Sequence, residues 1–338
     1  MAHELVRVGK LTKYQAAAIY QEKLDALVLG NYVIIDKLGA GGMGQVFRAR
    51  HRKMDRVVAL KLLPKKALSS PDAVERFHRE VKAAARLVHS HIVTALDADA
   101  GGGTHFLVME YIEGHDLSAL VKKEGPLPVS KAVTYTLQAA RGLEHAHAEN
   151  VIHRDVKPSN LLVDKRGTVK ILDMGLARFS DLPDSANVVD TSGANQLTQA
   201  GNIMGTVDYM APEQAVDTRQ ADERADIYSL GCALCYLLTG RPPFEGDTMM
   251  ARLVAHRDAP IPSLRKLRPD VPAALESLFQ HMLAKRPEDR PQTMTEIIAT
   301  LETIAGTRAA ATRTWRLPWI LAGGCAAAAA LVAVATLA

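Results

Sequence analysis

The densest group of potentially reactive side chains in the sequence lies between residues 151 and 175. It contains two carboxylates, Asp155 and Asp173, each in a short polar turn beside an apolar run. The first turn also carries these polar side chains: His153, Arg154, Lys157 and Asn160. A connecting loop does not need such a concentration of charged and hydrogen-bonding groups, so this segment is the first candidate for a catalytic site.

Two apolar runs at 161–163 and 169–172 flank a polar turn at 164–167, a pattern that predicts a short β-hairpin. Such a hairpin would return Asn160 and Asp173 to the same side of the molecule. The carboxylate of the first turn could then accept a proton, while the second carboxylate and the amide oxygen bind a divalent cation. Hard oxygen ligands of this kind suit Mg²⁺, which usually completes its shell with substrate phosphates.

The order of these residues resembles the catalytic loop and metal-binding triplet of eukaryotic-type protein kinases, in their bacterial Ser/Thr (Hanks-type) branch. The matching positions are His153-Arg154-Asp155 with Asn160, followed by Asp173-Met174-Gly175. The resemblance implies that Asp155 orients and deprotonates an acceptor hydroxyl, while Lys157 steadies the transferring phosphate. It also implies that Asn160 and Asp173 bind Mg²⁺, with Mn²⁺ as an alternative ion. Met174 stands where the family usually has Phe, and we expect it to pack beneath the helix of the small lobe.

A glycine-rich segment at 39–44 follows the apolar run 32–35. The glycine pattern alone is weak evidence, because a dinucleotide-binding oxidoreductase also carries one. That fold needs a helix directly after the glycines, whereas residues 46–50 predict a second strand. The glycines therefore lie at a hairpin, which matches the kinase lid whose backbone N–H groups close over the phosphates of ATP.

By resemblance, ATP contacts this lid and the strands around it: Leu38, Gly39, Ala40, Gly41, Gly42, Met43, Gly44, Val46, Ala59, Lys61, Met109, Glu110, Tyr111, Asp116 and Leu162. Val46 and Ala59 would clamp the adenine from above. The backbone of Glu110 and Tyr111 would bond the adenine edge. Asp116 could face the ribose, although a place at a solvated helix start explains this residue equally well.

The predicted helix at 70–88 would supply a further residue to this site. Its first residues, Ser-Pro-Asp, are a helix start signal. Glu80 lies on the apolar stripe of this helix, where a carboxylate is unfavourable unless it is paired. Lys61, which would reach the ATP phosphates, is the natural partner, and the family pairs these two positions in its active form. Exposure of Glu80 to solvent at the edge of the stripe is the alternative.

Residues 176–210 form a long segment with little hydrophobic periodicity, which favours a functional loop. By resemblance it is an activation segment, in which Thr198 would be phosphorylated and Arg154 would bind the phosphate. The alternative phosphorylation sites are Thr191 and Ser192. Thr206 would belong to a substrate-docking turn. A transient homodimer would allow one molecule to phosphorylate another.

Other residues of the large lobe support the resemblance. Lys157 is typical of the Ser/Thr-directed members, so protein substrates with Ser or Thr acceptors are expected. Asp226 opens an apolar helix that stops at Gly240, and by resemblance it would bond the backbone of the catalytic loop. Arg290 would pair with Glu213.

Composition limits the partners and the compartment. A chain of 338 residues with 48% hydrophobic content can bury two unequal lobes. Its 41 basic and 37 acidic residues give a net charge of +4, which is too balanced to favour nucleic acid as a partner. Of the three cysteines, Cys232 and Cys235 lie in an apolar run without a second pair at metal spacing. We therefore expect buried helix positions and a reducing compartment.

The two ends of the chain predict elements outside the kinase-like body. Residues 11–20 predict an amphipathic helix with Thr12 as a cap, similar to an extension found before some bacterial kinase domains. No signal peptide is expected, because the first residues lack a charged cluster followed by an apolar core.

The run 319–338 carries no charged residue and has the length of about 20 residues that a helix needs to cross a bilayer. The arginines that precede it are Arg308, Arg313 and Arg316. The positive-inside bias then predicts a single-pass protein of the inner (cytoplasmic) membrane with its kinase in the cytoplasm, contact with membrane lipid, and no external domain. An alanine-rich helix packed on the protein surface is the alternative.

These patterns predict an α+β, two-lobed protein kinase fold: a small β-rich N-lobe with one key helix, a large mostly helical C-lobe, and a C-terminal transmembrane helix. The expected boundaries are an extension at 1–31, a kinase domain at 32–305 (N-lobe 32–110, C-lobe 111–305), a basic linker at 306–318 and the span at 319–338. The expected function is ATP-dependent phosphorylation of Ser and Thr on proteins in membrane-anchored signalling. A catalytically weak binding scaffold is the alternative; loss of Lys61, Asp155 or Asp173 would indicate it, and all three are present.

Overall fold

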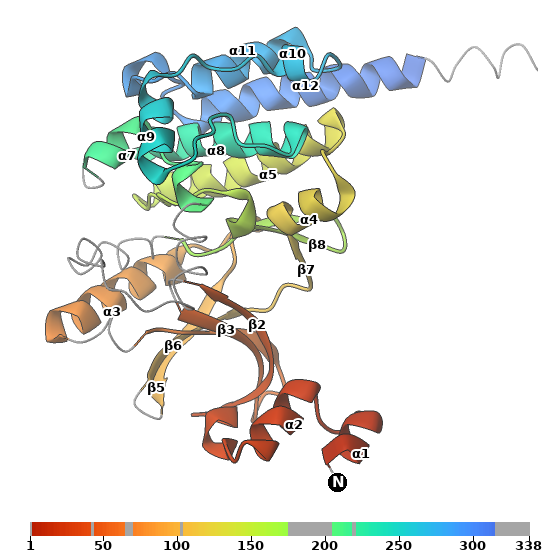
Figure 1. Ribbon diagram of the computed structural model, residues 1–338, viewed down its shortest axis with the longest axis vertical. Coiled ribbons are helices and arrows are strands. Elements are labelled where there is room, and N and C mark those ends of the chain that lie inside the picture. The colour runs from red at the N-terminus through yellow and green to blue at the C-terminus, as the bar shows by residue number, and fades with distance from the viewer. Residues whose placement is uncertain are drawn as a thin grey trace, which may run out of the picture.

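The computed structural model describes residues 2–41, 44–64, 70–101, 104–174, 205–217 and 221–314. Within these ranges the chain forms a small lobe around an antiparallel sheet and a large lobe of helices (Figure 1). The predicted two-lobed α+β architecture is therefore confirmed. Some predicted features lie outside the described residues: Gly42, Met43, Thr191, Ser192, Thr198 and the apolar run 319–338.

The described strands of the small lobe form one sheet, in the order β1-β2-β3-β4-β6-β5. The strands are β1 (Val28–Leu29), β2 (Tyr32–Gly41), β3 (Gly44–His51), β4 (Val57–Leu62), β5 (Ala95–Gly101) and β6 (Thr104–Glu110). The β2–β3 pairing continues to Gly41 and Gly44, so the glycines lie at a hairpin as predicted. Gly44 has a φ of 116°, and a Cβ there would lie 1.9 Å from the Leu62 carbonyl oxygen. No other residue fits that position.

The sheet has two apolar faces, because successive side chains of a strand point to opposite sides. Phe47 and Leu60 belong to the cluster on one face. Ala59 belongs to the cluster on the other face, together with Phe77 and Val81 of helix α3 (Pro71–Arg86). Helix α3 starts as predicted, and its N-cap hydroxyl accepts a hydrogen bond from the Ala73 N–H (3.2 Å).

The amino-terminal segment packs at the end of the small lobe that is remote from the large lobe (Figure 1). It forms α1 (Ala2–Arg7), α2 (Lys13–Tyr20) and the short 3₁₀ helix η1 (Leu24–Leu27). Thr12 caps α2 in a capping box with Gln15, which confirms the predicted helix and its cap. The partly buried residues Tyr14, Ala18 and Ile19 pack against the Phe47 side of the sheet.

The large lobe consists mainly of helices around a small three-stranded sheet. Its helices are α4 (Leu117–Glu124), α5 (Val129–Ala148), α7 (Pro212–Val216), α8 (Glu223–Thr239), α9 (Met249–Asp258), α10 (Leu264–Leu267), α11 (Ala273–Met282), α12 (Met294–Thr314) and the 3₁₀ turns η3 (Pro158–Asn160) and η6 (Pro287–Asp289). Its strands are β7 (Gly114–Asp116), β8 (Leu161–Asp164) and β9 (Val169–Ile171), in the order β7-β8-β9. The β8–β9 pair is the hairpin predicted between the two carboxylates.

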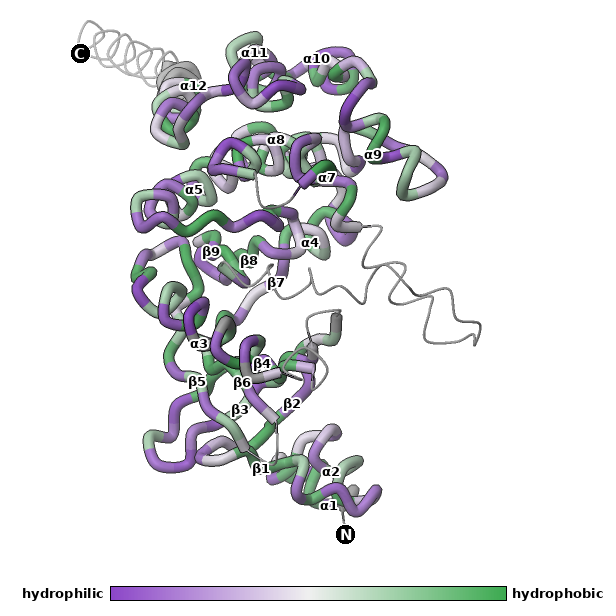
Figure 2. Tube along the Cα trace, turned by 90° about the vertical axis from the view of Figure 1, so that its left-hand side faces the viewer, coloured by the Kyte–Doolittle hydropathy of each residue, from purple (hydrophilic) through white to green (hydrophobic). Residues whose placement is uncertain are grey.

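Helix α8 is the centre of the large lobe, because all sides of it are covered by neighbouring elements (Figure 2). It begins at Glu223 with Asp222 as N-cap, three residues before the predicted start at Asp226, and it ends at Gly240 in a left-handed conformation (φ 76°). The helix starts earlier because the Asp222 carboxylate accepts a hydrogen bond from the Arg224 N–H in the first turn. Hydrophobic periodicity does not indicate such a cap. Cys232 and Cys235 are buried on this helix, as predicted.

A buried ion pair connects α7 to the end of the large lobe. Arg290 donates to both carboxylate oxygens of Glu213, at 2.7 and 2.8 Å. The Arg290 side chain is fully buried and also donates to backbone carbonyls of residues 224, 284 and 285. A desolvated arginine is stable here because all of its donors have partners. The predicted pairing is present.

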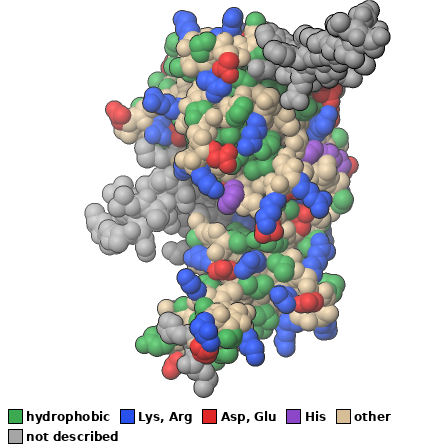
Figure 3. All heavy atoms as spheres, turned by 90° about the vertical axis from the view of Figure 1, so that its right-hand side faces the viewer, with side chains coloured by type: hydrophobic (Ala, Val, Ile, Leu, Met, Phe, Trp, Pro, Cys, Tyr) green, Lys and Arg blue, Asp and Glu red, His purple; other side chains and the backbone are tan. Residues whose placement is uncertain are grey.

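Basic and acidic side chains are interspersed on the face shown in Figure 3, as the small net charge of the chain suggests. Among the described residues, none of the helices combines the length and the apolar character that crossing a membrane requires.

Candidate active site

The carboxylate of Asp226 organises the backbone of the loop that precedes β8. It accepts hydrogen bonds from the N–H of His153 (2.9 Å), from the N–H of Arg154 (2.8 Å) and from Nε2 of His147 (2.8 Å). Asp226 is fully buried. Burial alone would raise the pKa of this carboxyl, but the hydrogen bond and charge of His147, together with the hydrogen bond from the His153 backbone, hold it below its ordinary value. The predicted contact between Asp226 and this loop is confirmed.

The imidazole of His153 connects the loop to the hairpin that follows. It is fully buried, and its Nδ1 accepts a hydrogen bond from the Asp155 N–H (3.1 Å). Because Nδ1 is the acceptor, Nε2 is the donor of this ring, and it donates to the Leu172 carbonyl (2.7 Å). His153 thereby holds the two turns that carry Asp155 and Asp173 at a fixed separation.

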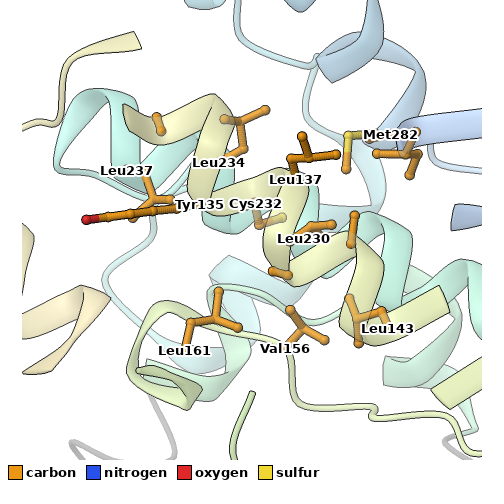
Figure 4. Close-up of a cluster of buried hydrophobic side chains, with 14 of the residues drawn as sticks. Tyr135, Leu137, Leu143, Val156, Leu161, Leu230, Cys232, Leu234, Leu237 and Met282 are labelled. Carbon is orange, nitrogen blue, oxygen red and sulfur yellow. The ribbon is translucent and has the colours of Figure 1, made fainter. Parts of the chain in front are cut away.

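Apolar side chains anchor the same loop to the core of the large lobe. Val156 and Leu161 point toward the side chains between α5 and α8, including Leu143 and Leu230 (Figure 4). Both are almost fully buried, with 1% exposure each. Asp155 directly precedes the first of these anchors, so packing limits its movement. Met174 is buried as expected, although its neighbours belong to this large-lobe core.

Two polar side chains contact the carboxylate of Asp155. Its Oδ2 lies 2.8 Å from Nζ of Lys157 and accepts a hydrogen bond from Nδ2 of Asn160 (3.0 Å). The Lys157 ammonium also donates to Oγ1 of Thr206 (2.7 Å). The residue predicted to lie in a substrate-docking turn is therefore connected through one lysine to the candidate base. An acceptor that approached this turn would meet the carboxylate and the ammonium together.

The hairpin brings Asn160 and Asp173 together, as the sequence predicted. The Leu172 N–H donates to the Asn160 carbonyl (2.9 Å), which joins the two ends of the hairpin. Asn160 uses its Nδ2 to bond Asp155, so its amide oxygen is the atom that remains for a cation. Asp173 itself has a left-handed backbone (φ 59°), an unusual conformation for a residue with a side chain.

Lys61 of β4 forms an ion pair with Asp173, whose Oδ2 lies 2.8 Å from the lysine Nζ. The lysine side chain is only 4% exposed, whereas the carboxylate is 22% exposed. Burial would raise the pKa of Asp173, but the charge and hydrogen bond of Lys61 hold it below its ordinary value. The contact joins the small lobe to the large lobe and keeps the carboxylate ionised.

Glu80 lies half-buried on α3. Its side chain is therefore neither deep in the core nor fully in solvent. The predicted pair between Lys61 and Glu80 stays a prediction, whereas the ion pair of Lys61 with Asp173 was not expected from the sequence. Sequence spacing does not indicate which acid contacts the lysine, because the distances depend on how the lobes meet.

Three of the residues predicted to contact ATP lie on one face of the small-lobe sheet. Val46, Ala59 and Met109 belong to a single apolar cluster. Leu38 is 46% exposed and lies just before the glycine-rich turn. Leu162 of β8 is half-buried, whereas its neighbours Leu161 and Val163 belong to the large-lobe core. The cluster of Val46, Ala59 and Met109 also includes Leu172, which follows β9, so this apolar group reaches the large lobe.

The end of β6 has a polar connection to the large lobe that the sequence did not predict. Glu110 Oε1 accepts hydrogen bonds from the Thr94 N–H (2.9 Å) and from Nζ of Lys170 on β9 (2.7 Å). The Glu110 N–H donates to the Thr94 carbonyl (3.0 Å), so this donor is engaged within the small lobe. The predicted contact of an adenine edge with the backbone of Glu110 and Tyr111 stays a prediction. For Asp116, the structure shows the alternative role, because its side chain caps α4 at the Ala119 N–H (2.8 Å).

A second missed contact holds the loop from the side of α7. The side chain of Gln214 donates from Nε2 to the Arg154 carbonyl (3.0 Å) and accepts from the Ala211 N–H (3.0 Å). Gln214 is buried, with 4% exposure. No spacing in the sequence indicates this burial. A buried amide needs partners on both of its polar atoms, and both atoms of Gln214 have one. Arg154 has a left-handed backbone (φ 66°). Its N–H donates to Asp226 and its carbonyl accepts from Gln214, so side chains hold the peptide groups on both sides of this residue.

The donor atoms at the hairpin fit a magnesium ion. Asp173 offers an ionised carboxylate and Asn160 an amide oxygen, both of them hard ligands. Within the described residues, no group of three or more His, Cys, Asp or Glu side chains is arranged to hold a metal. Two protein ligands accord with the preference of Mg²⁺ for completing its shell with water and substrate phosphates.

The fold and this arrangement define a phosphotransferase site of the protein kinase type. The model of the protein kinase domain family matches residues 32–301, and the chain therefore belongs to the protein kinase family, in its bacterial Hanks-type Ser/Thr branch.

Named relatives support this placement. The chain is 39% identical over 274 residues to serine/threonine-protein kinase pkn3 of Myxococcus xanthus, covering 79% of this chain and 48% of that protein. It is 38% identical over 275 residues to serine/threonine-protein kinase PknB of Mycolicibacterium smegmatis, covering 80% and 42%. The chain thus spans less than half the length of these two relatives. It also resembles the crystal structure of the Mycobacterium tuberculosis PknI kinase domain, with a TM-score of 0.63 and 26% identity, covering 83% of this chain and 98% of that chain.

We expect Asp226→Asn to disturb the catalytic loop. An amide oxygen accepts as the carboxylate does, but the NH₂ group would face an N–H donor of the loop. Loss of a charge-assisted hydrogen bond in a buried site costs about 2–3 kcal/mol. Urea unfolding should therefore show a decrease of this size in the free energy of unfolding.

The matched control is Asp222→Asn at the N-cap of the same helix. Asparagine caps a helix about as well as aspartate, so this variant should unfold close to the wild type. Equal stability of Asp226→Asn and the wild type would contradict the role assigned to the buried carboxylate.

Proposed function

We propose that the protein transfers the γ-phosphoryl group of ATP to Ser and Thr hydroxyls of protein substrates. The observation that carries this proposal is the meeting of Asp155, Lys157 and Asn160 in one loop, next to the Lys61–Asp173 pair. A catalytically weak scaffold would have no need to keep all of these groups in contact. The family membership of the chain supports the same reaction.

Each residue has a separate task in the proposed reaction. Asp155 accepts the proton of the attacking hydroxyl and orients it. Lys157 balances the negative charge of the transferring phosphate, and Thr206 fixes the ammonium in place. Lys61 contacts the phosphates of ATP from the small lobe. Asn160 and Asp173 would hold Mg²⁺, which would neutralise the charge of the nucleotide phosphates.

The Lys61–Asp173 pair has a consequence for the arrival of the nucleotide. The proposed cation would compete with Lys61 for the Asp173 carboxylate. The ATP phosphates would compete with Asp173 for the Lys61 ammonium. The lysine then exchanges one anionic partner for another, and the buried charge remains compensated throughout. Mn²⁺ would suit the same oxygen ligands.

The first test is Asp155→Asn. Proton abstraction and positioning typically contribute about 10²-fold or more to the rate, so phosphate transfer to a general acceptor protein should fall at least that far. ATP affinity should change little, because the base acts on the acceptor. Chelation of divalent ions should abolish transfer by the wild-type protein.

Asp164→Asn is the control for this test, since the Asp164 carboxylate accepts from the Arg166 and Thr168 N–H groups in the hairpin turn. Its rate should match that of the wild type. Retention of more than about a tenth of the wild-type rate by Asp155→Asn would refute the assigned role, given the contribution expected of a general base. Absence of transfer by the wild type would favour the scaffold.

Activation through phosphorylation of Thr198 forms a second part of the proposal. A phosphothreonine adds nearly two negative charges and several acceptor oxygens, enough to order a segment against an arginine. Arg154 lies next to the candidate base and is the proposed partner. A transient homodimer would allow one molecule to modify another.

Peptide mapping of autophosphorylated protein tests this idea, with Thr198→Ala and Arg154→Gln assayed beside it. Phosphate should be found on Thr198, and both variants should lose most of the activation that follows preincubation with ATP. The rate of autophosphorylation should rise more steeply than linearly with protein concentration. Full activity of Thr198→Ala, or phosphate only at Thr191 or Ser192, would refute the choice of residue.

The third part of the proposal is attachment to the cytoplasmic membrane by residues 319–338, with the kinase lobes in the cytoplasm. The support is the uncharged run of suitable length behind a group of arginines. Full-length protein should sediment with membranes and resist extraction by high salt, whereas a version ending at Gly306 should remain in the supernatant. Release by salt alone would indicate surface binding through the arginines and would exclude a span.

A further inference from the structure

The outer edge of strand β2 is only partly covered by another strand. The β1–β2 ladder joins Leu29 to Tyr32 and Val28 to Val33, and it ends there. From that point β2 continues to Gly41 with β3 on its other side. An open strand edge presents backbone groups that need partners. In this protein the amino-terminal helix α2 lies beside this part of the sheet (Figure 1).

Strand β2 contains two irregular positions on its way to the glycine-rich turn. Its register with β3 shifts between Ile34 and Asp36 and again between Lys37 and Gly39. Ile35 and Leu38 are therefore extra residues in the strand. Such bulges bend a strand and increase its twist, and they often re-aim a chain beside a functional site. The second bulge directly precedes the glycines.

The cap of α2 is attached to the first bulge. The Thr12 hydroxyl donates to the Ile35 carbonyl, and Nε2 of Gln15 donates to the Ile34 carbonyl (2.8 Å). The same two side chains also close the capping box, in which Gln15 Oε1 accepts from the Thr12 N–H (3.0 Å) and Thr12 Oγ1 accepts from the Gln15 N–H (3.1 Å). One pair of residues thus satisfies both the helix end and the irregular strand.

Apolar packing keeps this cap in place. Tyr14 lies with its ring centroid 5.8 Å from that of Phe47 on β3. Ala18 and Ile19 pack on the same apolar cluster. The helix is therefore fixed to β3, which supports the adenine face, while its polar cap holds β2. Both strands of the glycine-rich hairpin are connected to one helix.

We infer that residues 11–20 are a positioning element of the nucleotide site, in which Thr12 and Gln15 fix the bulged course of β2 and thereby the glycine-rich turn over ATP. This inference rests on the proposed ATP-dependent function. Thr12 and Gln15 are positioning residues, because they act through the backbone of β2. A purely structural extension would stabilise the small lobe without affecting nucleotide affinity.

The decisive variant is Gln15→Glu in the full chain. Glutamate still closes a capping box, so α2 keeps its helix start, but it has no donor for the Ile34 carbonyl. Thr12→Val removes both the donor to Ile35 and the acceptor of the helix cap with little change in shape, and Thr12→Ser restores both. Tyr20→Ala is the matched control on the same helix, since Tyr20 is 89% exposed.

The first measurement is the dissociation constant for ATP, determined by competition with a fluorescent ATP analogue. The second is the rate of amide hydrogen exchange of residues 36–46. A lost hydrogen bond corresponds to a change of about threefold to tenfold. We expect Gln15→Glu and Thr12→Val to weaken ATP binding by this factor and to speed exchange in the turn. Thr12→Ser and Tyr20→Ala should match the wild type, and the KM for the acceptor protein should stay unchanged in all variants.

Two results would overturn the inference in different ways. Variants that lower the thermal unfolding temperature but keep the ATP affinity and exchange of the wild type would show that α2 only stabilises the lobe. A wild-type protein that bound no ATP would overturn the proposed function and this inference with it. The first result leaves the proposed function intact, so the two failures are distinguishable.

Discussion

The buried carboxylate of Asp226 is the constraint on which the candidate site depends. The loop before β8 cannot satisfy its own backbone groups, because it is irregular and includes a left-handed residue at Arg154. Asp226 accepts two of its N–H groups, and Gln214 donates to one of its carbonyls. Since Asp226 lies on the fully enclosed helix α8, its hydrogen bonds fix the loop to the packed core of the large lobe. The position of Asp155 is therefore determined by packing far from any substrate.

Among the described residues, two ion pairs cross between the lobes, one deep in the site and one at the end of β6. Lys61 of the small lobe contacts Asp173, while Glu110 at the end of β6 contacts Lys170 on β9. Lys170 and Asp173 belong to the same short stretch of chain. A movement of the lobes that separated one pair would therefore strain the other. The relative position of the lobes depends on charge as well as on apolar packing.

Much of the local arrangement could be predicted from the sequence, because it depends on short spacings. The hairpin that joins Asn160 to Asp173, and the cap at Thr12, follow from turn and capping patterns within a few residues. The partner of Lys61 and the side-chain contacts of Glu110 could not be predicted, since they depend on how the two lobes meet. Resemblance to a family supplied the long-range contact of Asp226, which no periodicity or spacing indicates.

The enclosure of α8 has a chemical consequence for its two thiols. Burial raises the pKa of Cys235 to about 12 and raises that of Cys232 as well. Peroxides and alkylating reagents attack the thiolate, which is scarce when the pKa is raised and the sulfur is screened from solvent. The sulfur atoms at the centre of the large lobe are thus inert, and oxidative conditions should leave the loop that α8 supports unchanged.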